Sequence, residues 1–200
     1  MEEKLKQKSG NLVKVVLYGP ESTGKTTLAK RLAEHYKTAW VPEFARDYLQ
    51  EKWDREQKAC ERKDMIPIAV GQMESENELA KEADTVLILD TNLLVTMVYS
   101  EAYYDGYVDP LLEKYALESQ YDLYLLTYID TPWEPDDLRD RPDRREEMFD
   151  YFLNTLDTHG LPYEILKGDK EERFIKATNL IDKLIAHDPT TKRRSKANKE

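Results

Sequence analysis

The sequence lacks the features of an exported, disulfide-stabilised or membrane-spanning chain. It has a single cysteine, Cys60, in 200 residues, which excludes an internal disulfide and a cysteine-based zinc site. No apolar run approaches the roughly 20 residues needed to span a bilayer. The N-terminus MEEKLKQKSG is charged and lacks the apolar stretch of a secretory signal. These absences predict a cytoplasmic protein with no membrane partner.

Basic residues are also in deficit. Lys and Arg number 30 against 40 Asp and Glu, so the net charge is −10. A protein that binds duplex nucleic acid normally presents a basic face, which argues against a nucleic-acid partner. An acidic chain repels free nucleotide at long range, so any nucleotide site must be locally positive, whereas a cationic small molecule would be attracted.

The remaining composition, 40% hydrophobic and 35% charged, is that of a globular chain of a length that suits one domain. Apolar runs alternate with helical patterns, which predicts an α/β fold with a largely parallel sheet. We expect a single domain over residues 1–186. Residues 187–200 carry five basic side chains and no apolar periodicity, so we expect a flexible, solvated tail rather than a nucleic-acid arm.

The expected elements follow from apolar runs and from helical periodicity. Expected strands cover residues 12–18, 38–41, 85–90, 121–127 and 163–167. Expected helices cover residues 25–36, 43–51, 59–83 with a bend near Pro67, 93–104, a segment ending in YALESQ, 145–160 with Gly160 as its C-terminal cap, and 170–186.

A phosphate-binding loop follows the first expected strand. Residues 19–26, GPESTGKT, fit the P-loop pattern G-x-x-x-x-G-K-[ST]. The glycines allow a tight turn that brings backbone N–H groups inward, and the following helix adds partial positive charge at its N-terminus. Lys25 can reach the β- and γ-phosphates, and the Thr26 hydroxyl can ligate Mg²⁺. The predicted ligands of ATP in this loop are Gly19, Glu21, Ser22, Thr23, Gly24, Lys25 and Thr26.

An acidic residue closes the buried run VLILD. A carboxylate at this position, Asp90, is placed to hold Mg²⁺ directly or through water beside the nucleotide. The alternative is structural, because Asp90-Thr91-Asn92 can also cap the helix that follows. The order of the motifs along the chain favours the metal role.

Residues 130–145, DTPWEPDDLRDRPDRR, have the composition of a mobile lid. Phosphoryl transfer to a small molecule requires basic groups over the γ-phosphate and exclusion of water. Arg139 and Arg144 are the first candidates, and Trp133 and the prolines would stiffen the segment. The alternative is a solvated charged loop, since aspartates are interleaved with the arginines.

The segment VPEFARDY follows the second expected strand. Glu43 falls at the carboxyl end of that strand, where sites form in parallel sheets. A carboxylate there can accept the proton of an acceptor hydroxyl or hold a ribose diol. Arg46 can orient Glu43 or contact a phosphate. The alternative is an ordinary surface pair at a helix start.

These segments occur in an order that resembles the bacterial nicotinamide-riboside kinases. The resemblance covers about residues 12–180. The segments that carry it are GPESTGKTTLAKRLAEHY, VPEFARDYL, IAVGQ, LILDT, YDLYLL and DTPWEPDDLRD. In the best-known members this kinase is the C-terminal domain of a bifunctional protein that begins with a nicotinamide-mononucleotide adenylyltransferase. Here 11 residues precede the first expected strand, which predicts a free-standing kinase or a relative with another role.

The resemblance implies a P-loop NTPase fold of the nucleoside-kinase type, with sheet order 2-3-1-4-5 and an Arg-rich lid. It implies transfer of the ATP γ-phosphate to the 5′-hydroxyl of nicotinamide riboside in NAD biosynthesis. It assigns Gly24, Lys25, Thr26 and Thr27 to ATP phosphates and Mg²⁺, and Asp90 to the metal. By the same resemblance Glu43 and Arg46 line the nucleoside side, and Arg139 and the arginines after it act from the lid.

One departure leaves the acceptor open. An aromatic residue is expected just before the acid, to stack on the pyridinium ring, and this sequence has Pro42 there. Another nucleoside, or a cationic vitamin such as thiamine, remains an alternative acceptor, as does a slow, regulatory ATPase in place of a kinase. The oligomeric state is also left open. The aromatic residues that can supply a cation–π contact instead are Trp40, Phe44, Tyr48, Trp53 and Trp133.

Overall fold

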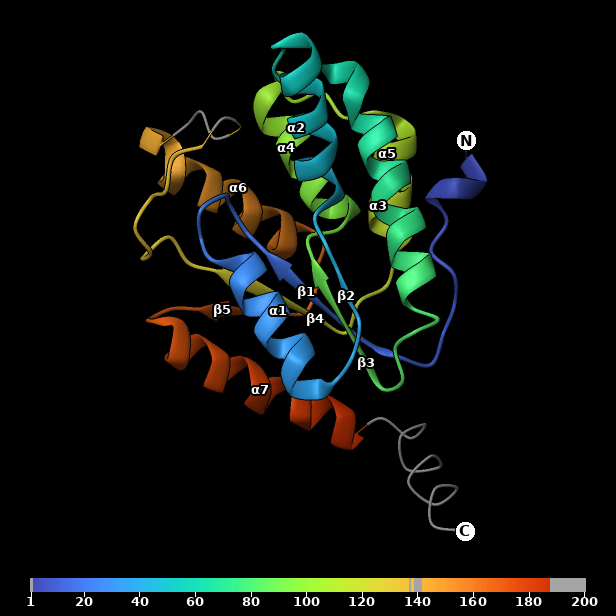
Figure 1. Ribbon diagram of the computed structural model, residues 1–200, viewed down its shortest axis with the longest axis vertical. Helices are drawn as coiled ribbons and strands as arrows, with labels where there is room; N and C mark the ends of the chain where they lie inside the picture. The colour runs from blue at the N-terminus through green and yellow to red at the C-terminus, as the bar shows by residue number, and fades with distance from the viewer. Residues whose placement is uncertain (1, 137, 139–141, 188–200) are drawn as a thin grey trace.

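One parallel sheet of five strands organises the molecule (Figure 1). The computed structural model describes residues 2–136, 138 and 142–187. The strands pair in the order β2-β3-β1-β4-β5, and every pairing is parallel, which confirms the predicted order. Their bounds are β1 Val13–Tyr18, β2 Trp40–Val41, β3 Val86–Asp90, β4 Leu123–Thr127 and β5 Tyr163–Leu166.

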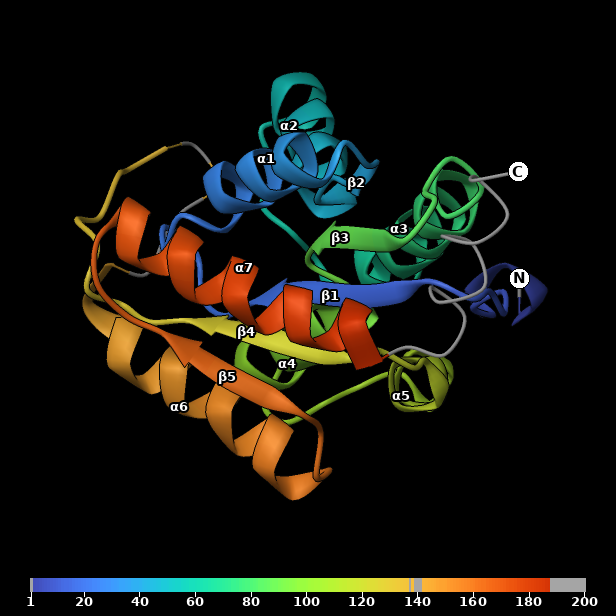
Figure 2. The same ribbon diagram turned by 90° about the horizontal axis from the view of Figure 1, so that it is seen from below.

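Helices cover both faces of the sheet. Figure 2 shows α1 and α7 on one side, while α3 to α6 lie on the other. The α-helices are α1 Lys25–Tyr36, α2 Phe44–Glu56, α3 Met65–Leu79, α4 Leu93–Tyr103, α5 Pro110–Glu118, α6 Arg145–Thr158 and α7 Lys170–His187. Short 3₁₀ turns cover Glu2–Leu5, Arg62–Asp64 and Pro142–Arg144.

Strand β1 is buried along its whole length and divides the core in two. Val15 and Leu17 pack toward α1 and α7, whereas Val16 and Tyr18 pack toward the opposite helices. This alternation is the period of two that a strand imposes on side chains. Because both faces are covered, β1 is apolar apart from Lys14, as is usual for a central parallel strand.

The predicted helix over residues 59–83 is wrong at its start. Residues 57–61 are not helical, and α3 begins at Met65 and ends at Leu79. Glu61 and Asp64 form a reciprocal capping box on the preceding 3₁₀ turn. Pro67 then falls in the first turn of α3, where its missing N–H leaves no intrahelical bond unmade, so it begins the helix rather than bending it.

The remaining boundaries agree within a few residues. The second expected strand is reduced to two residues, and the second helix runs on to Glu56. Gly160 has φ +61° just past the end of α6, as predicted for a C-terminal glycine. Within the described part of the chain, none of the helices has the length and apolarity needed to cross a membrane. Residues 188–200 of the predicted tail lie outside the described residues.

The parallel arrangement brings five connections to one edge of the sheet. They are the P-loop after β1, the turn from β2 to α2, the residues after β3, the segment after β4, and the turn from β5 to α7. Sites form at the carboxyl edge of parallel sheets because such connections converge there.

Candidate active site

The P-loop turns as its glycines predict. Gly19 has φ +129°, and a Cβ there would lie 2.9 Å from Thr127 Oγ1, so no side chain fits. Gly24 has φ +82° at the N-cap of α1, and Ser22 between them has φ +56°. Left-handed backbone at these positions curls the loop over the N-terminus of α1, where backbone N–H groups and the helix dipole favour a phosphate.

Side chains of the loop hold it closed from within. Lys25 Nζ donates to the Pro20 carbonyl at 2.7 Å, and Thr23 Oγ1 donates to the same oxygen at 2.8 Å. Thr23 also bonds Thr127 on β4, with 2.7 Å between the hydroxyl oxygens. Lys25 is only 8% exposed. The ammonium group is therefore held inside the loop, close to where a triphosphate would lie.

Asp90 lies beside this loop at the end of β3. It pairs in register with Leu17, two residues before the P-loop begins, and it is 1% exposed. Neither carboxylate oxygen makes a hydrogen bond of normal geometry. Burial raises the pKa of Asp90, and the neighbouring Lys25 ammonium and Thr26 hydroxyl oppose that rise.

The alternative role of Asp90 as a helix cap is not what the structure shows. Asn92 is the N-cap of α4, and its side-chain oxygen accepts the Val95 N–H at 3.3 Å. A buried acid with two unsatisfied oxygens, next to a threonine hydroxyl, fits a divalent cation. Across the described residues no group of three or more acidic, histidine or cysteine side chains could close a metal site alone. Nucleotide phosphates would supply the other ligands, as at P-loop sites generally.

A cavity of about 700 Å³ is lined by the P-loop and by residues of α2, α3 and α4. Glu43 and Arg46 line it, as do the P-loop residues from Glu21 to Thr27. Apolar and aromatic residues line it as well: Trp53, Met65, Ile68, Tyr99, Tyr103 and Tyr104. The two halves predicted from the sequence, phosphate loop and acceptor-side acid, therefore face one chamber.

Only one of the predicted aromatic candidates reaches this chamber. Trp53 lines it. The tyrosines of α4 and of the residue after it, Tyr99, Tyr103 and Tyr104, line it as well and were not anticipated. The sequence feature that contains these tyrosines is the apolar run of α4, and such a run is equally typical of a helix buried in the core. The other candidates are not among the lining residues: Trp40, Phe44, Tyr48 and Trp133.

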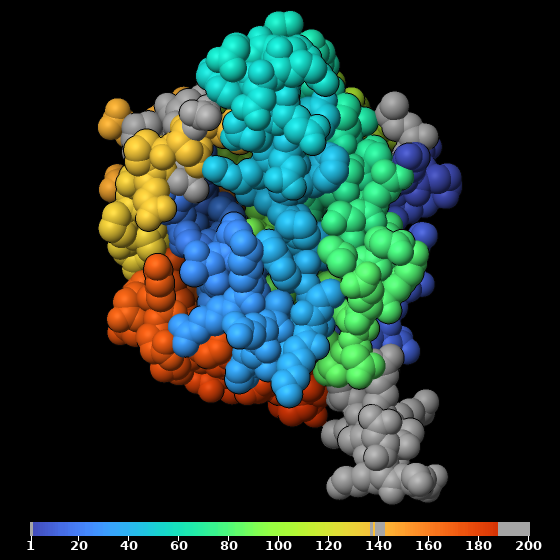
Figure 3. Space-filling view, in the orientation of Figure 1, coloured from blue at the N-terminus to red at the C-terminus, as the bar shows by residue number. Residues whose placement is uncertain are grey.

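The segment after β4 contacts the P-loop at Ser22. Thr131 Oγ1 donates to the Ser22 carbonyl at 2.8 Å, and the Glu134 N–H donates to Ser22 Oγ at 2.9 Å. Arg145 donates to the carbonyl oxygens of Thr131 at 2.8 Å and Ser22 at 3.3 Å, and Trp133 lies 5.7 Å from its guanidinium carbon. Figure 3 shows this segment, in yellow, beside the blue P-loop region.

The arginines of this segment differ in their surroundings. Arg145 is partly buried, which lowers the pKa of its guanidinium group below the ordinary value. Arg144 is exposed, forms an ion pair with Glu147 one turn on, and does not line the cavity. Arg139 lies outside the described residues. Asp136 of the segment pairs with Arg46 on α2 at 2.5 Å, so the segment also touches the acceptor side.

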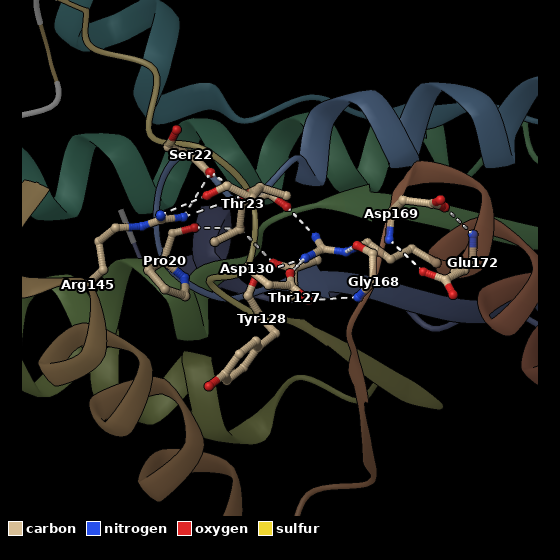
Figure 4. Close-up of polar contacts among 12 residues, drawn as sticks. Pro20, Ser22, Thr23, Thr127, Tyr128, Asp130, Arg145, Gly168, Asp169 and Glu172 are labelled. Carbon is tan, nitrogen blue, oxygen red and sulfur yellow. Dashed lines mark hydrogen bonds and ion pairs between the residues drawn. The ribbon is translucent and has the colours of Figure 1, made fainter.

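Arg173 on α7 anchors the P-loop, and no pattern in the sequence predicts this role. It is 4% exposed and donates to the Thr23 carbonyl of the P-loop at 2.6 Å. The same guanidinium donates to the carbonyls of Tyr128 and Gly168, both at 2.9 Å, and forms an ion pair with Asp130. In Figure 4, Ser22 and Thr23 lie between Arg145 on one side and Asp130 and Gly168 on the other.

Comparison with known proteins identifies relatives of this chain. The chain is 26% identical over 174 residues to the trifunctional NAD biosynthesis/regulator protein NadR of Escherichia coli and to that of Salmonella typhimurium. The match covers 86% of this chain and 42% of each relative, so the chain spans less than half of their length.

Solved structures share the fold. NadR in complex with NR superposes with a TM-score of 0.75 at 24% identity, over 86% of this chain and 51% of that one. NadR with NAD and AMP-PNP gives 0.72 at 25% identity, over 86% and 49%. Thymidylate kinase from Candida albicans gives 0.65 at 14% identity, over 88% and 93%. The architecture is thus that of P-loop kinases.

A family model described as an AAA domain matches residues 14–173, which run from β1 through the P-loop to the arginine that anchors it. With its phosphate loop and sheet order, the chain belongs to this AAA domain family.

Proposed function

We propose that the protein is a Mg·ATP-dependent kinase that transfers the γ-phosphate to a nucleoside hydroxyl, the 5′-hydroxyl of nicotinamide riboside. The observation that carries the proposal is that one cavity is lined both by Lys25 with the rest of the P-loop and by Glu43. A kinase needs both substrates in one chamber, whereas a phosphate switch needs only the first. The similarity to NadR, which has been crystallised with NR and with AMP-PNP, supports the choice of substrates.

Each residue has a role that follows from its chemistry. The P-loop N–H groups and the Lys25 ammonium neutralise charge on the transferring phosphate oxygens. Glu43 accepts the proton of the acceptor hydroxyl as its oxygen attacks the γ-phosphorus and ADP leaves. Mg²⁺, held by Thr26 and Asp90, would balance the negative charge of the β- and γ-phosphates. Arg46 lines the chamber, and Arg145 donates to the Ser22 carbonyl of the P-loop, so both add basic groups to the site.

The acceptor end of the cavity suits a flat, cationic ring. Aromatic faces attract a cation through their quadrupole, and three tyrosines and Trp53 line the cavity. The protein's net charge of −10 also favours a cation over an anion. These tyrosines and Trp53 take the place of the aromatic residue that is missing at Pro42.

The test measures whether ATP is consumed only when an acceptor is present. Purified protein with Mg·ATP is incubated with nicotinamide riboside, other nucleosides or thiamine, and ADP and phosphorylated acceptor are quantified. We expect turnover with nicotinamide riboside and little ADP without acceptor. Equal ADP formation with and without every acceptor would contradict the kinase and favour a regulatory ATPase. Turnover with a different acceptor would correct the substrate.

Two substitutions test the acceptor-side acid and the P-loop lysine separately. Glu43→Gln should lower kcat by about 10²–10⁴-fold, the usual contribution of a general base, while nucleotide affinity stays unchanged. Lys25→Ala should weaken both nucleotide binding and transfer. Glu51→Gln on the exposed face of α2 is the matched control and should leave both unchanged. Full turnover by Glu43→Gln would show that Glu43 has another role.

A further inference from the structure

The turn that carries Glu43 has little support from the sheet. Strand β2 makes only two register pairs, Trp40 with Ile88 and Val41 with Leu89, before the chain leaves the sheet. The next residue, Pro42, has no N–H to donate. Glu43 then follows as the N-cap of α2, and its own side chain makes no capping hydrogen bond to the helix. A catalytic carboxylate on such a turn needs another anchor to hold a fixed position.

Gln72 on α3 supplies that anchor on both sides of Glu43. Its Nε2 donates to the Pro42 carbonyl at 3.2 Å, and its Oε1 accepts the Phe44 N–H at 2.9 Å. A carbonyl can only accept and an N–H can only donate, so these two partners fix the orientation of the amide. Gln72 is 2% exposed, and at such a depth an unpaired backbone group is costly.

The neighbouring Gly71 makes the close approach of the turn possible. A Cβ at Gly71 would lie 2.2 Å from ring atoms of Phe44, so any side chain would displace that ring. The Phe44 ring thus packs directly on α3 at Gly71. The side-chain amide of the next residue, Gln72, bonds the backbone on both sides of Glu43. Together Gly71 and Gln72 form a seat on α3 for residues 42–44.

We infer that Gln72 is a positioning residue for Glu43, which it holds toward the acceptor through the backbone on either side. The inference rests on the proposed kinase function for its catalytic consequence, and on the geometry alone for the anchoring itself. Only a side chain with one donor and one acceptor reproduces the bracket. Gln72→Met keeps the length and loses both bonds, whereas Gln72→Glu keeps the acceptor and loses the donor.

Amide hydrogen exchange tests the anchoring without any activity. The Phe44 N–H should exchange at least tenfold faster in Gln72→Met than in the wild type, and little faster in Gln72→Glu. Glu74→Met, on the exposed part of the same helix, should not change it. Unchanged exchange at Phe44 in Gln72→Met would overturn the anchoring, whatever reaction the protein catalyses.

A double-mutant cycle with Glu43→Gln tests the positioning. Gln72→Met alone should lower kcat by roughly 10- to 100-fold, the scale expected when a catalytic group is misplaced by about 1 Å, with nucleotide affinity unchanged. In the Glu43→Gln background the same change should have less than a twofold effect on kcat, because the group it positions is already disabled. Gln72→Glu should restore part of the rate.

The outcomes separate the two hypotheses. Additive losses in the cycle, or an unchanged kcat in Gln72→Met, would overturn the positioning role while leaving the kinase intact. If the wild type turns over no acceptor, the proposed function fails, and the exchange of the Phe44 amide alone decides whether Gln72 anchors the turn.

Discussion

At the scale of single residues, the site contains a carboxylate whose position opposes the stability of the nucleotide-free protein. Asp90 is almost fully buried, and neither oxygen has a hydrogen-bond partner of normal geometry. A buried charge without full compensation costs free energy of folding. Binding residues often carry such a cost, because the compensating group arrives only with the ligand.

The substitution Asp90→Asn should therefore stabilise the protein in the absence of nucleotide and metal. Burial raises the pKa of Asp90 above its ordinary value of 3.8, so the folded state disfavours the ionised form. The gain should be complete above the raised pKa and should vanish as the pH falls below about 3.8, where the wild-type side chain is protonated in both states. Thermal unfolding across pH measures it, and each kcal/mol corresponds to about 2–4 °C in Tm.

The matched control for that change is Asp150→Asn on the exposed face of α6, which should leave Tm unchanged across the pH range. A lower Tm for Asp90→Asn at neutral pH would mean that the Lys25 ammonium compensates Asp90 more than burial penalises it.

At the scale of elements, the P-loop is held by segments distant in sequence. Thr127 of β4 contacts Thr23 from one side, and Arg173 of α7 binds the Thr23 carbonyl from another. The guanidinium has its donors spread over three carbonyls and a carboxylate, an arrangement suited to a planar, multiply donating group. The last helix thus fixes the backbone that binds phosphate.

Arg173→Met should lower the free energy of unfolding by about 2–3 kcal/mol, since it leaves several acceptors without a donor. It should also weaken nucleotide binding, because Thr23 loses its anchor. Arg173→Lys keeps the charge without the fork and should fall between. Urea unfolding and nucleotide titration measure the two effects, and Lys183→Met, exposed on the same helix, is the control. Wild-type nucleotide affinity in Arg173→Met would show that α7 does not set the loop.

The difference between local and distant contacts also explains how far the sequence could predict this site. The strand, P-loop and α1 are specified by neighbouring residues, and their predicted bounds are confirmed within one residue. The start of α3 was missed because Pro67 reads equally as a bend or as a first-turn residue. Arg173 could not be found, since its partner Thr23 lies 150 residues away and one arginine in an amphipathic helix has no local signature.

Whole-molecule charge bears on the acceptor. Residues 188–200 hold more basic than acidic side chains. The net charge of the remaining residues is therefore more negative than −10. Among the charged side chains that line the cavity, Lys25 belongs to the P-loop, whereas Glu43 lies near Arg46, whose charge is offset by its ion pair with Asp136. Such a field attracts a cation to one end of the chamber, while the P-loop alone draws the nucleotide to the other.

The affinity for nicotinamide riboside should therefore weaken with salt. Raising KCl from about 20 mM to about 0.5 M shortens the screening length from roughly 20 Å to roughly 4 Å, which removes most of the long-range attraction. The reduced, dihydropyridine form of the same riboside is neutral and nearly identical in shape, so its affinity should change little over the same range. Titration calorimetry with an unreactive ATP analogue present measures both ligands. If both weaken equally, the acidic field plays no part in the choice of acceptor, and shape and ring contacts alone select it.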